Sequence, residues 1–149
     1  MNLNIIAMTI EEQKAELVEE FDLFEDWMDK YNYIIEMGKD LEGLPEENKT
    51  KQFLISGCQS QVWLTANYDN GKIHFQADSD AIITKGIAQL LIRVVDNRSP
   101  KEIIDEDFSF LDKIGLKEHL SPTRSNGLTS MIKQIKLYAL VFKTKEEQK

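Results

Sequence analysis

An Asn70-Gly71 pair between two alternating segments is the sequence feature that most constrains this fold. In residues 62–68 and again in residues 73–77, apolar side chains occupy every second position, which is the period of a half-buried β-strand. Asn-Gly between such segments is typical of a two-residue turn, because both residues readily adopt the left-handed backbone that the turn requires. We therefore predict an antiparallel β-hairpin over residues 62–77.

Residues N-terminal to this hairpin show mainly helical periodicity. Thr9 and Glu12 stand at the spacing of a capping box, in which two side chains accept backbone N–H bonds across the first turn of a helix. Asp22 and Glu25 repeat this spacing, so we predict two helices that meet near Asp22. The segment Gln52–Ser56 (QFLIS) is predicted to be a short strand, which gives a sheet of about three strands.

C-terminal to the hairpin the helical pattern returns. Asp78 and Asp80, in the sequence DSDA, are suitable N-cap residues for the next helix. Ser99–Glu102 (SPKE) forms another capping box with proline at the favoured first helical position, and a further short helix is predicted over 107–113. The segment Leu120–Gly127 is predicted to be a turn-rich connection to the last helix.

Helices that precede and follow a small antiparallel sheet in the sequence, and pack around it, indicate the α+β class. A chain of 149 residues suits one compact domain, and we assign residues 1–149 to it, with loose termini at 1–8 and 143–149. A domain of this size buries roughly 68–70% of the surface of its unfolded chain. We therefore expect it to fold without a disulfide or a metal.

The composition excludes several classes of function. Acidic residues outnumber basic ones by 26 to 18, and the net charge of −8 disfavours binding to the phosphates of nucleic acids. No apolar run approaches the roughly 18 residues of a membrane span, and the N-terminus lacks the charged and apolar regions of a secretory signal. A single cysteine gives no sign of an oxidising compartment. We expect a cytoplasmic protein without a nucleic-acid or membrane partner.

The single cysteine, Cys58, lies in an unusual setting for a buried thiol. It follows Gly57 and precedes Gln59, Ser60 and Gln61, whereas structural cysteines usually have aliphatic neighbours. One interpretation is a small core residue. The other is a nucleophilic thiol on a loop, since Gly57 allows a backbone conformation that presents the side chain.

Two kinds of nucleophilic chemistry are consistent with one reactive cysteine. A hydrolase would need His74 or His119 as a base and a carboxylate to orient it, but no motif surrounds either histidine. Thiol exchange needs one thiolate and a docking surface, so the composition favours transfer of sulfur. The sequence contains no Gly-rich phosphate loop, zinc-ligand spacing or serine nucleophile motif, so we expect no metal and no cofactor.

Several motifs together resemble the SufE family of sulfur acceptors for cysteine desulfurases. They are GCQSQVW around the cysteine, DSDA after the hairpin, Lys85-Gly86, and HLSPTRSNGL before the last helix. The resemblance extends from Tyr33–Gly38 through the last helix. It implies an α+β fold similar to the IscU scaffold. It also implies a protein that takes persulfide sulfur onto Cys58, stimulates the desulfurase and passes the sulfur to an iron–sulfur cluster scaffold.

The same resemblance implies roles for four residues. Cys58 would be the nucleophile that forms the persulfide. Asp80 would restrain the cysteine loop, Gln59 would hydrogen-bond the loop backbone, and Arg124 would dock the desulfurase or steady the thiolate. From the residues alone, Asp80 fits a helix cap, Gln59 fits a common turn amide, and Arg124 fits a surface arginine.

The resemblance also implies the partners of the protein. They are a SufS-like or CsdA-type cysteine desulfurase, which carries its own pyridoxal phosphate, and a SufBCD-like scaffold complex. The protein would hold no cofactor itself and would act as a covalent sulfur carrier rather than as a standalone enzyme. The sequence leaves a monomer and a homodimer both open. The competing interpretations are a non-catalytic adaptor with a structural Cys58 and, less favoured, a hydrolase that depends on Cys58.

Overall fold

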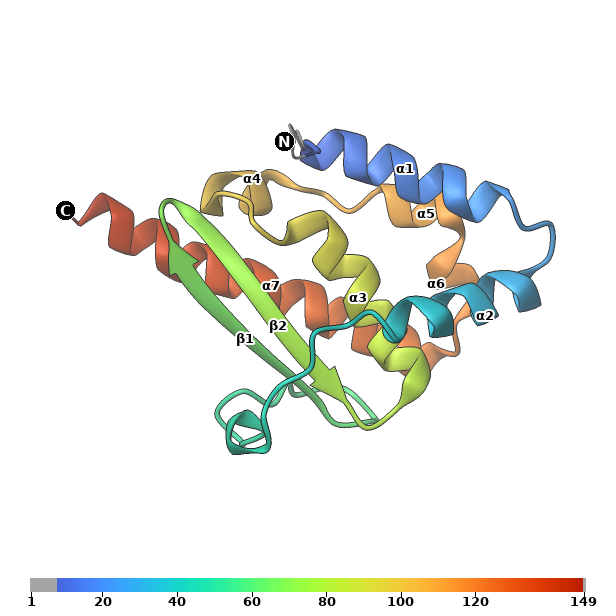
Figure 1. Ribbon diagram of the computed structural model, residues 1–149, viewed down its shortest axis with the longest axis horizontal. Coiled ribbons are helices and arrows are strands. Elements are labelled where there is room, and N and C mark those ends of the chain that lie inside the picture. The colour runs from blue at the N-terminus through green and yellow to red at the C-terminus, as the bar shows by residue number, and fades with distance from the viewer. Residues whose placement is uncertain (1–7, 149) are drawn as a thin grey trace, which may run out of the picture.

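The computed structural model describes residues 8–148. In it, helices pack against one face of a β-hairpin (Figure 1). This arrangement is the predicted α+β class. In those residues no helix is long and apolar enough to cross a membrane. The elements in chain order are α1 (Ile10–Asp22), α2 (Trp27–Gly38), the 3₁₀ turn η1 (Glu46–Asn48), β1 (Val62–Asp69), β2 (Lys72–Ser79), α3 (Ile82–Val95), α4 (Pro100–Asp105), α5 (Phe110–Ile114), α6 (Leu116–His119) and α7 (Pro122–Glu147).

Two helices form the N-terminal part, as the capping patterns predict. Thr9 and Glu12 make both bonds of the capping box at the start of α1. The chain breaks after Asp22, but the second cap is Asp26, whose side chain accepts a hydrogen bond from the backbone N–H of Asp29 at 2.9 Å. The predicted capping box of Asp22 and Glu25 is therefore wrong, although the break itself is confirmed. Residues 1–7, which include most of the predicted loose N-terminus, lie outside the described residues.

The hairpin forms in the predicted register, with Asn70 and Gly71 at its turn. Their φ angles are 52° and 81°, so both adopt the left-handed backbone of the turn. The sheet has two strands rather than about three. The predicted strand Gln52–Ser56 makes only one isolated bridge, between Leu54 and Trp63, because turn-type bonds from Phe53 and Leu54 to residues 50 and 51 curl this segment.

Helix α3 lies at the centre of the molecule and contacts β2, α1, α2 and α7 (Figure 1). Its sequence is apolar on nearly every side, as expected for a helix that is surrounded by other elements. The buried apolar residues of α3 are Ile83, Ile87, Ala88, Leu90, Leu91, Val94 and Val95. The first turn of this central helix also forms one wall of the site described below.

The last helix is longer at both ends than the sequence predicts. Ser121 caps α7 by accepting a bond from the backbone N–H of Arg124, and Pro122 occupies the first helical position. The predicted connection Leu120–Gly127 is therefore mostly helical, because a Ser-Pro start outweighs the turn-forming residues after it. At the other end α7 continues to Glu147, supported by an ion pair between Lys143 and Glu147 at 3.0 Å, where we predict a loose tail.

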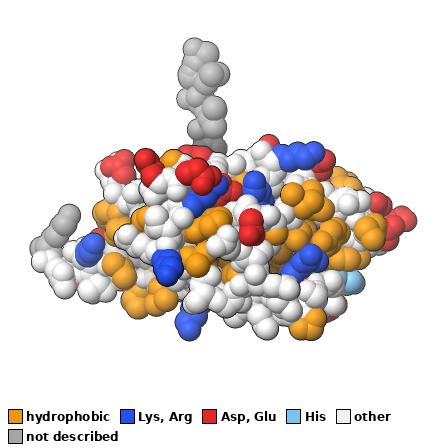
Figure 2. Space-filling model, turned by 90° about the horizontal axis from the view of Figure 1, so that it is seen from below, with side chains coloured by type: hydrophobic (Ala, Val, Ile, Leu, Met, Phe, Trp, Pro, Cys, Tyr) orange, Lys and Arg blue, Asp and Glu red, His pale blue; other side chains and the backbone are white. Residues whose placement is uncertain are grey.

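Charge is unevenly distributed over the surface. Figure 2 shows one face on which apolar side chains lie among lysines and arginines, while acidic side chains gather mainly at its edges. Part of α7 is also apolar and exposed, at Leu137, Leu140 and Val141. The net negative charge therefore does not prevent this molecule from offering apolar and basic surface to a partner.

Candidate functional site

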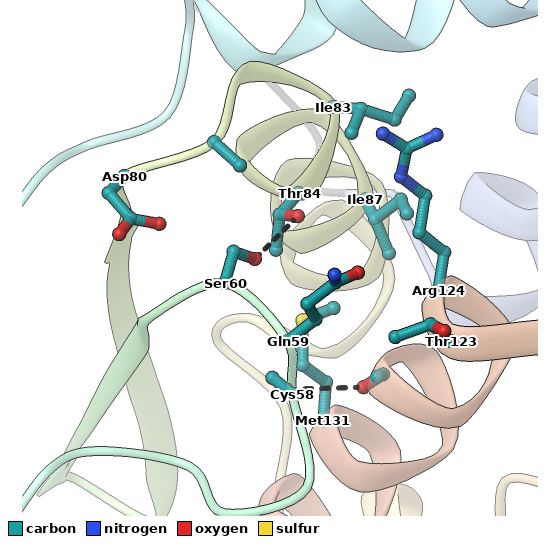
Figure 3. Close-up of a pocket in the computed structure, with 12 residues that line it drawn as sticks. Cys58, Gln59, Ser60, Asp80, Ile83, Thr84, Ile87, Thr123, Arg124 and Met131 are labelled. Carbon is teal, nitrogen blue, oxygen red and sulfur yellow. Dashed lines mark hydrogen bonds between the residues drawn. The ribbon is translucent and has the colours of Figure 1, made fainter.

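Cys58 lies in the loop Gly57–Gln61, which leads directly into β1, as predicted (Figure 3). Gly57 has a φ of 91°, and a Cβ atom there would lie 2.6 Å from Oγ of Ser130 on α7. The Cys58 thiol is partly buried, and its sulfur lies 3.8 Å from the backbone carbonyl oxygen of Gly127, to which the S–H donates. The loop therefore rests on the N-terminal turns of α7.

A cavity of about 350 Å³ opens beside the thiol. Three elements meet around it: the cysteine loop, the start of α3 and the first turns of α7 (Figure 3). Its lining residues are Cys58, Gln59, Ser60, Asp80, Ala81, Ile83, Thr84, Ile87, Thr123, Arg124, Gly127 and Met131. All four predicted site residues, Cys58, Gln59, Asp80 and Arg124, thus lie around a single cavity.

The surroundings of Cys58 favour the neutral thiol over the thiolate. Burial raises the pKa of the Cys58 thiol above its ordinary value. The thiolate is the nucleophilic form of cysteine. In this conformation burial therefore disfavours the thiolate relative to a cysteine in water.

Asp80 holds the end of the cysteine loop rather than the helix. Its Oδ1 accepts a hydrogen bond from the backbone N–H of Gln61 at 3.0 Å. The N-cap of α3 is Ala81, which makes no side-chain cap bond, so the predicted capping role of Asp78 and Asp80 is wrong. The reason is that β2 continues to Ser79, so both carboxylates bond to other backbone groups.

Asp78 is buried away from the cysteine cavity and joins other segments. It accepts bonds from the backbone N–H groups of Ser79 and Leu44, and it pairs with Lys49 at 3.2 Å and Lys85 at 3.6 Å. Burial opposes ionisation of this carboxyl, but the two backbone bonds and Lys49 together hold the pKa of Asp78 below its usual value. Asp78 is therefore a structural carboxylate.

Arg124 and Gln59 occupy the rim of the cavity. Arg124 lies in the first turn of α7, exposed, with its guanidinium 5.8 Å from the centre of the Tyr31 ring. Within residues 8–148 this guanidinium makes no hydrogen bond or ion pair. The Gln59 amide likewise makes no hydrogen bond in this part of the chain, so the bond to the loop backbone that the resemblance implies is not observed. Both side chains are exposed at the surface.

Sequence reasoning missed several residues that build the site. Oγ of Ser60 lies 3.1 Å from Oγ1 of Thr84 on α3, and Oγ of Ser79 donates to the carbonyl oxygen of Gln61 at 2.7 Å. Gly127 supplies the carbonyl that faces the thiol. Ser60 and Ser79 belong to the quoted motifs, but nothing in their local sequence identifies their partners.

Neither histidine lies at the cavity. His74 sits on β2 opposite Asn67, with its Nδ1 3.0 Å from Oδ1 of Asp96. His119 stacks on Trp27 with ring centres 4.5 Å apart. A cysteine hydrolase would therefore lack a histidine base in this conformation. Within residues 8–148 no group of three or more His, Cys, Asp or Glu side chains is placed to hold a metal ion.

The family model described as "SufE: Fe-S metabolism associated domain" matches residues 15–139. This chain belongs to the SufE family. An uncharacterized SufE-like protein of Rhizobium etli is 40% identical over 131 residues, 85% of this chain and 88% of the relative. A SufE-like protein of Synechocystis is 35% identical over 141 residues, 95% of this chain and 89% of the relative. The family thus associates this chain with iron–sulfur metabolism.

The fold has a solved counterpart. The solution structure of a hypothetical protein from Thermus thermophilus superposes with a TM-score of 0.73. It covers 89% of this chain and 96% of that chain at 19% identity. This likeness establishes the fold of the SufE-family chain and carries no information on its function.

Proposed function

We propose that this protein is a sulfur carrier that accepts persulfide sulfur on Cys58 from a cysteine desulfurase. The observation that carries the proposal is the convergence of Cys58, Asp80 and Arg124 on one cavity, although Cys58 and Arg124 lie 66 positions apart in the sequence. Membership of the SufE family supports it, because the family is associated with iron–sulfur metabolism. Arg124 and the exposed Gln59 would contact the desulfurase.

The transfer step is a thiol exchange without net oxidation or reduction. The Cys58 thiolate attacks the outer sulfur of a cysteine persulfide on the desulfurase, and a new S–S bond forms at Cys58. The S–S bond of the donor breaks, and the donor cysteine leaves as a thiolate with the electron pair. The proton of Cys58 passes to water before the attack.

In this proposal the loop opens before the transfer step. The thiol faces the carbonyl oxygen of Gly127 and is partly buried, and burial raises its pKa. Swinging the loop outward on the desulfurase would bring the sulfur to water and to the donor, which removes the penalty on the thiolate. Closing afterwards would shelter the persulfide from oxidants and reductants.

The remaining parts of the proposal concern the partners. The desulfurase would be SufS-like or CsdA-type and would supply its own pyridoxal phosphate, which forms the persulfide from free cysteine. The recipient would be a SufBCD-like scaffold complex in the cytoplasm. In a second thiol exchange, a scaffold cysteine would attack the outer sulfur of the Cys58 persulfide. Cys58 would leave as a thiolate and return to the thiol.

A Cys58→Ser variant separates this carrier from an adaptor. The measurement is the rate at which the desulfurase releases alanine from cysteine, with and without this protein. We expect the intact protein to raise the rate and Cys58→Ser to have no effect, because the variant cannot remove sulfur from the desulfurase. Equal stimulation by both proteins would mean that the protein acts by docking alone and that Cys58 is structural.

A further inference from the structure

The two ends of the cysteine loop are held by unequal sets of bonds. At its C-terminal end, the backbone of Gln61 makes three hydrogen bonds. Its N–H donates to Asp80 Oδ1 at 3.0 Å. Its carbonyl oxygen accepts from Ser79 Oγ at 2.7 Å and from the Asp80 N–H at 3.3 Å. These bonds join Gln61 to the end of β2. Gln61 is therefore part of the sheet framework and would stay in place when the loop moves.

The segment Gly57–Ser60 is held much more weakly. Among the bonds within residues 8–148, no backbone N–H or carbonyl of this segment bonds to another backbone group. The Cys58 thiol is a weak donor at 3.8 Å from the Gly127 carbonyl oxygen. The remaining bond is between the hydroxyls of Ser60 and Thr84, at 3.1 Å. Within the described residues, this hydroxyl pair is the one hydrogen bond between oxygen or nitrogen atoms that joins Gly57–Ser60 to the body of the protein.

Thr84 is well placed for such a tie. It lies in the first turn of the central helix α3, which is fixed by packing, and only 8% of its surface is exposed. Threonine in a helix often bonds back to a carbonyl of the preceding turn. Here its hydroxyl instead reaches across to the loop. Because both hydroxyls line the cavity, water can replace their mutual bond when the loop opens, so the tie is reversible.

We propose that the Ser60–Thr84 hydroxyl pair is a latch that positions Cys58 and sets the fraction of molecules in which the thiol is available. Thr84 and Ser60 are positioning residues, since neither touches the transferred sulfur. Gly57, whose φ of 91° suits glycine, begins the latched segment. The claim that the open form accepts sulfur rests on the function proposed above. The existence of the latch does not depend on that function.

The latch is tested first in the free protein, by the rate at which iodoacetamide alkylates Cys58. If alkylation proceeds through the open loop, removing one hydrogen bond raises the open population and the rate by about three- to tenfold. We expect this increase in Thr84→Val and in Ser60→Ala. Thr84→Ser keeps the hydroxyl and should restore the original rate. Thr65→Val, a matched change at a buried threonine of β1, should leave it unchanged.

Two results would overturn the latch. One is an unchanged alkylation rate in both Thr84→Val and Ser60→Ala. The other is an equal increase in Thr84→Ser and Thr84→Val, which would assign the effect to packing rather than to the hydroxyl. Ser60→Ala changes a partly exposed loop residue, so its result stands even if the helix variant folds poorly.

The second test uses the desulfurase and the KM for this protein as sulfur acceptor. A larger open population lowers the apparent KM by the same factor as it raises alkylation and leaves kcat at saturation unchanged. A fall in kcat with constant KM would contradict the latch. If the unmodified protein accepts no sulfur at all, the function proposed above fails, while the alkylation rates still decide whether the latch exists.

Discussion

Two glycines with positive φ, one before and one after strand β1, are held in different ways. At one end, Asn70 and Gly71 form a turn whose shape follows from these two residues, and a Cβ on Gly71 would meet nothing within 4 Å. At the other end, Gly57 opens the cysteine loop, and its conformation depends on contacts with α3, α7 and the end of β2. The turn is specified locally, whereas the loop is specified by distant residues.

The comparison separates a part of the chain whose shape is set locally from a part whose shape is set by contacts with other elements. The Asn70-Gly71 turn depends on its own two residues, so movement of distant elements does not remove the cause of its shape. The segment Gly57–Ser60, whose bonds lead to α3 and α7, could leave them together when a partner offers replacements, while Gln61 and the strand that follows stay in place. The hairpin thus supplies the fixed end, and the contacts to α3 and α7 supply the part that a desulfurase would release.

Substituting the two glycines gives the largest expected difference between these regions. Alanine at Gly57 or Gly71 is strained by about 1–2 kcal/mol at positive φ. At Gly57 the new Cβ also meets Ser130 Oγ at 2.6 Å. We expect Gly57→Ala to displace the loop and raise the alkylation rate of Cys58 by about five- to thirtyfold.

Gly71→Ala is the control for that measurement. It should lower the thermal midpoint by about 2–8 °C, given about 1–2 kcal/mol of strain in a domain of this size, and leave alkylation unchanged. Adding Ser130→Ala to Gly57→Ala should recover part of the original alkylation rate. A faster reaction in Gly71→Ala, or none in Gly57→Ala, would show that the two regions are not held differently.

Removal of the Asp80 carboxylate should have a smaller effect on the same rate. Asp80→Ala deletes the acceptor of the Gln61 N–H but leaves the bond from Ser79 to the Gln61 carbonyl in place. Because Asp80 is exposed, water replaces part of the lost bond, and we expect alkylation to rise about two- to fivefold. Asp69→Ala, at an exposed aspartate beside the hairpin turn, should not change the rate. Equal effects of the two substitutions would remove Asp80 from the loop framework.

The smallest expected effect is a dependence of stability on pH. Burial raises the pKa of Cys58 in the folded state, so the folded protein retains this proton at pH values where the unfolded chain has lost it. The resulting stabilisation is complete below the unfolded pKa, about 8.5, and is lost as pH rises through the folded pKa. Above a pH of about 8.5 the unfolding free energy of the protein with Cys58 should therefore fall relative to that of Cys58→Ser.

Urea titrations of both proteins from pH 7 to pH 10 measure this shift. In parallel, the alkylation rate of native Cys58 should reach half of its maximum at a higher pH than that of the urea-unfolded chain. A native profile at the same or a lower pH would mean that the loop does not shelter the thiol.

Local patterns in the sequence were sufficient for much of the fold. The hairpin turn, the capping box of Thr9 and the capping box of Ser99 are each formed by residues within a few positions of one another. Such features follow from backbone preferences and short-range bonds. The prediction of a third strand at Gln52–Ser56 is wrong. Turn-type backbone bonds curl this segment, and the pattern of apolar residues does not reveal them.

The site was only partly predictable. Cys58 stands out by its polar neighbours, but the residues that hold it come from distant parts of the chain. Ser60 and Thr84 lie 24 positions apart, and Cys58 and Gly127 lie 69 apart. The role of Asp80 on the cysteine loop followed from the family resemblance, while its local sequence favoured a helix cap. Contacts of this range are set by how α3 and α7 pack against the hairpin, which no single motif encodes.

The central claim is tested most directly by the intact mass of this protein after incubation with a SufS-like desulfurase, pyridoxal phosphate and cysteine. We expect a gain of one sulfur atom, which a thiol reductant removes and which is absent in Cys58→Ser. Alanine formation in the same mixture shows that the desulfurase is active. An unchanged mass while alanine forms, repeated with a CsdA-type desulfurase, would contradict the account and leave Cys58 as a structural residue of an adaptor.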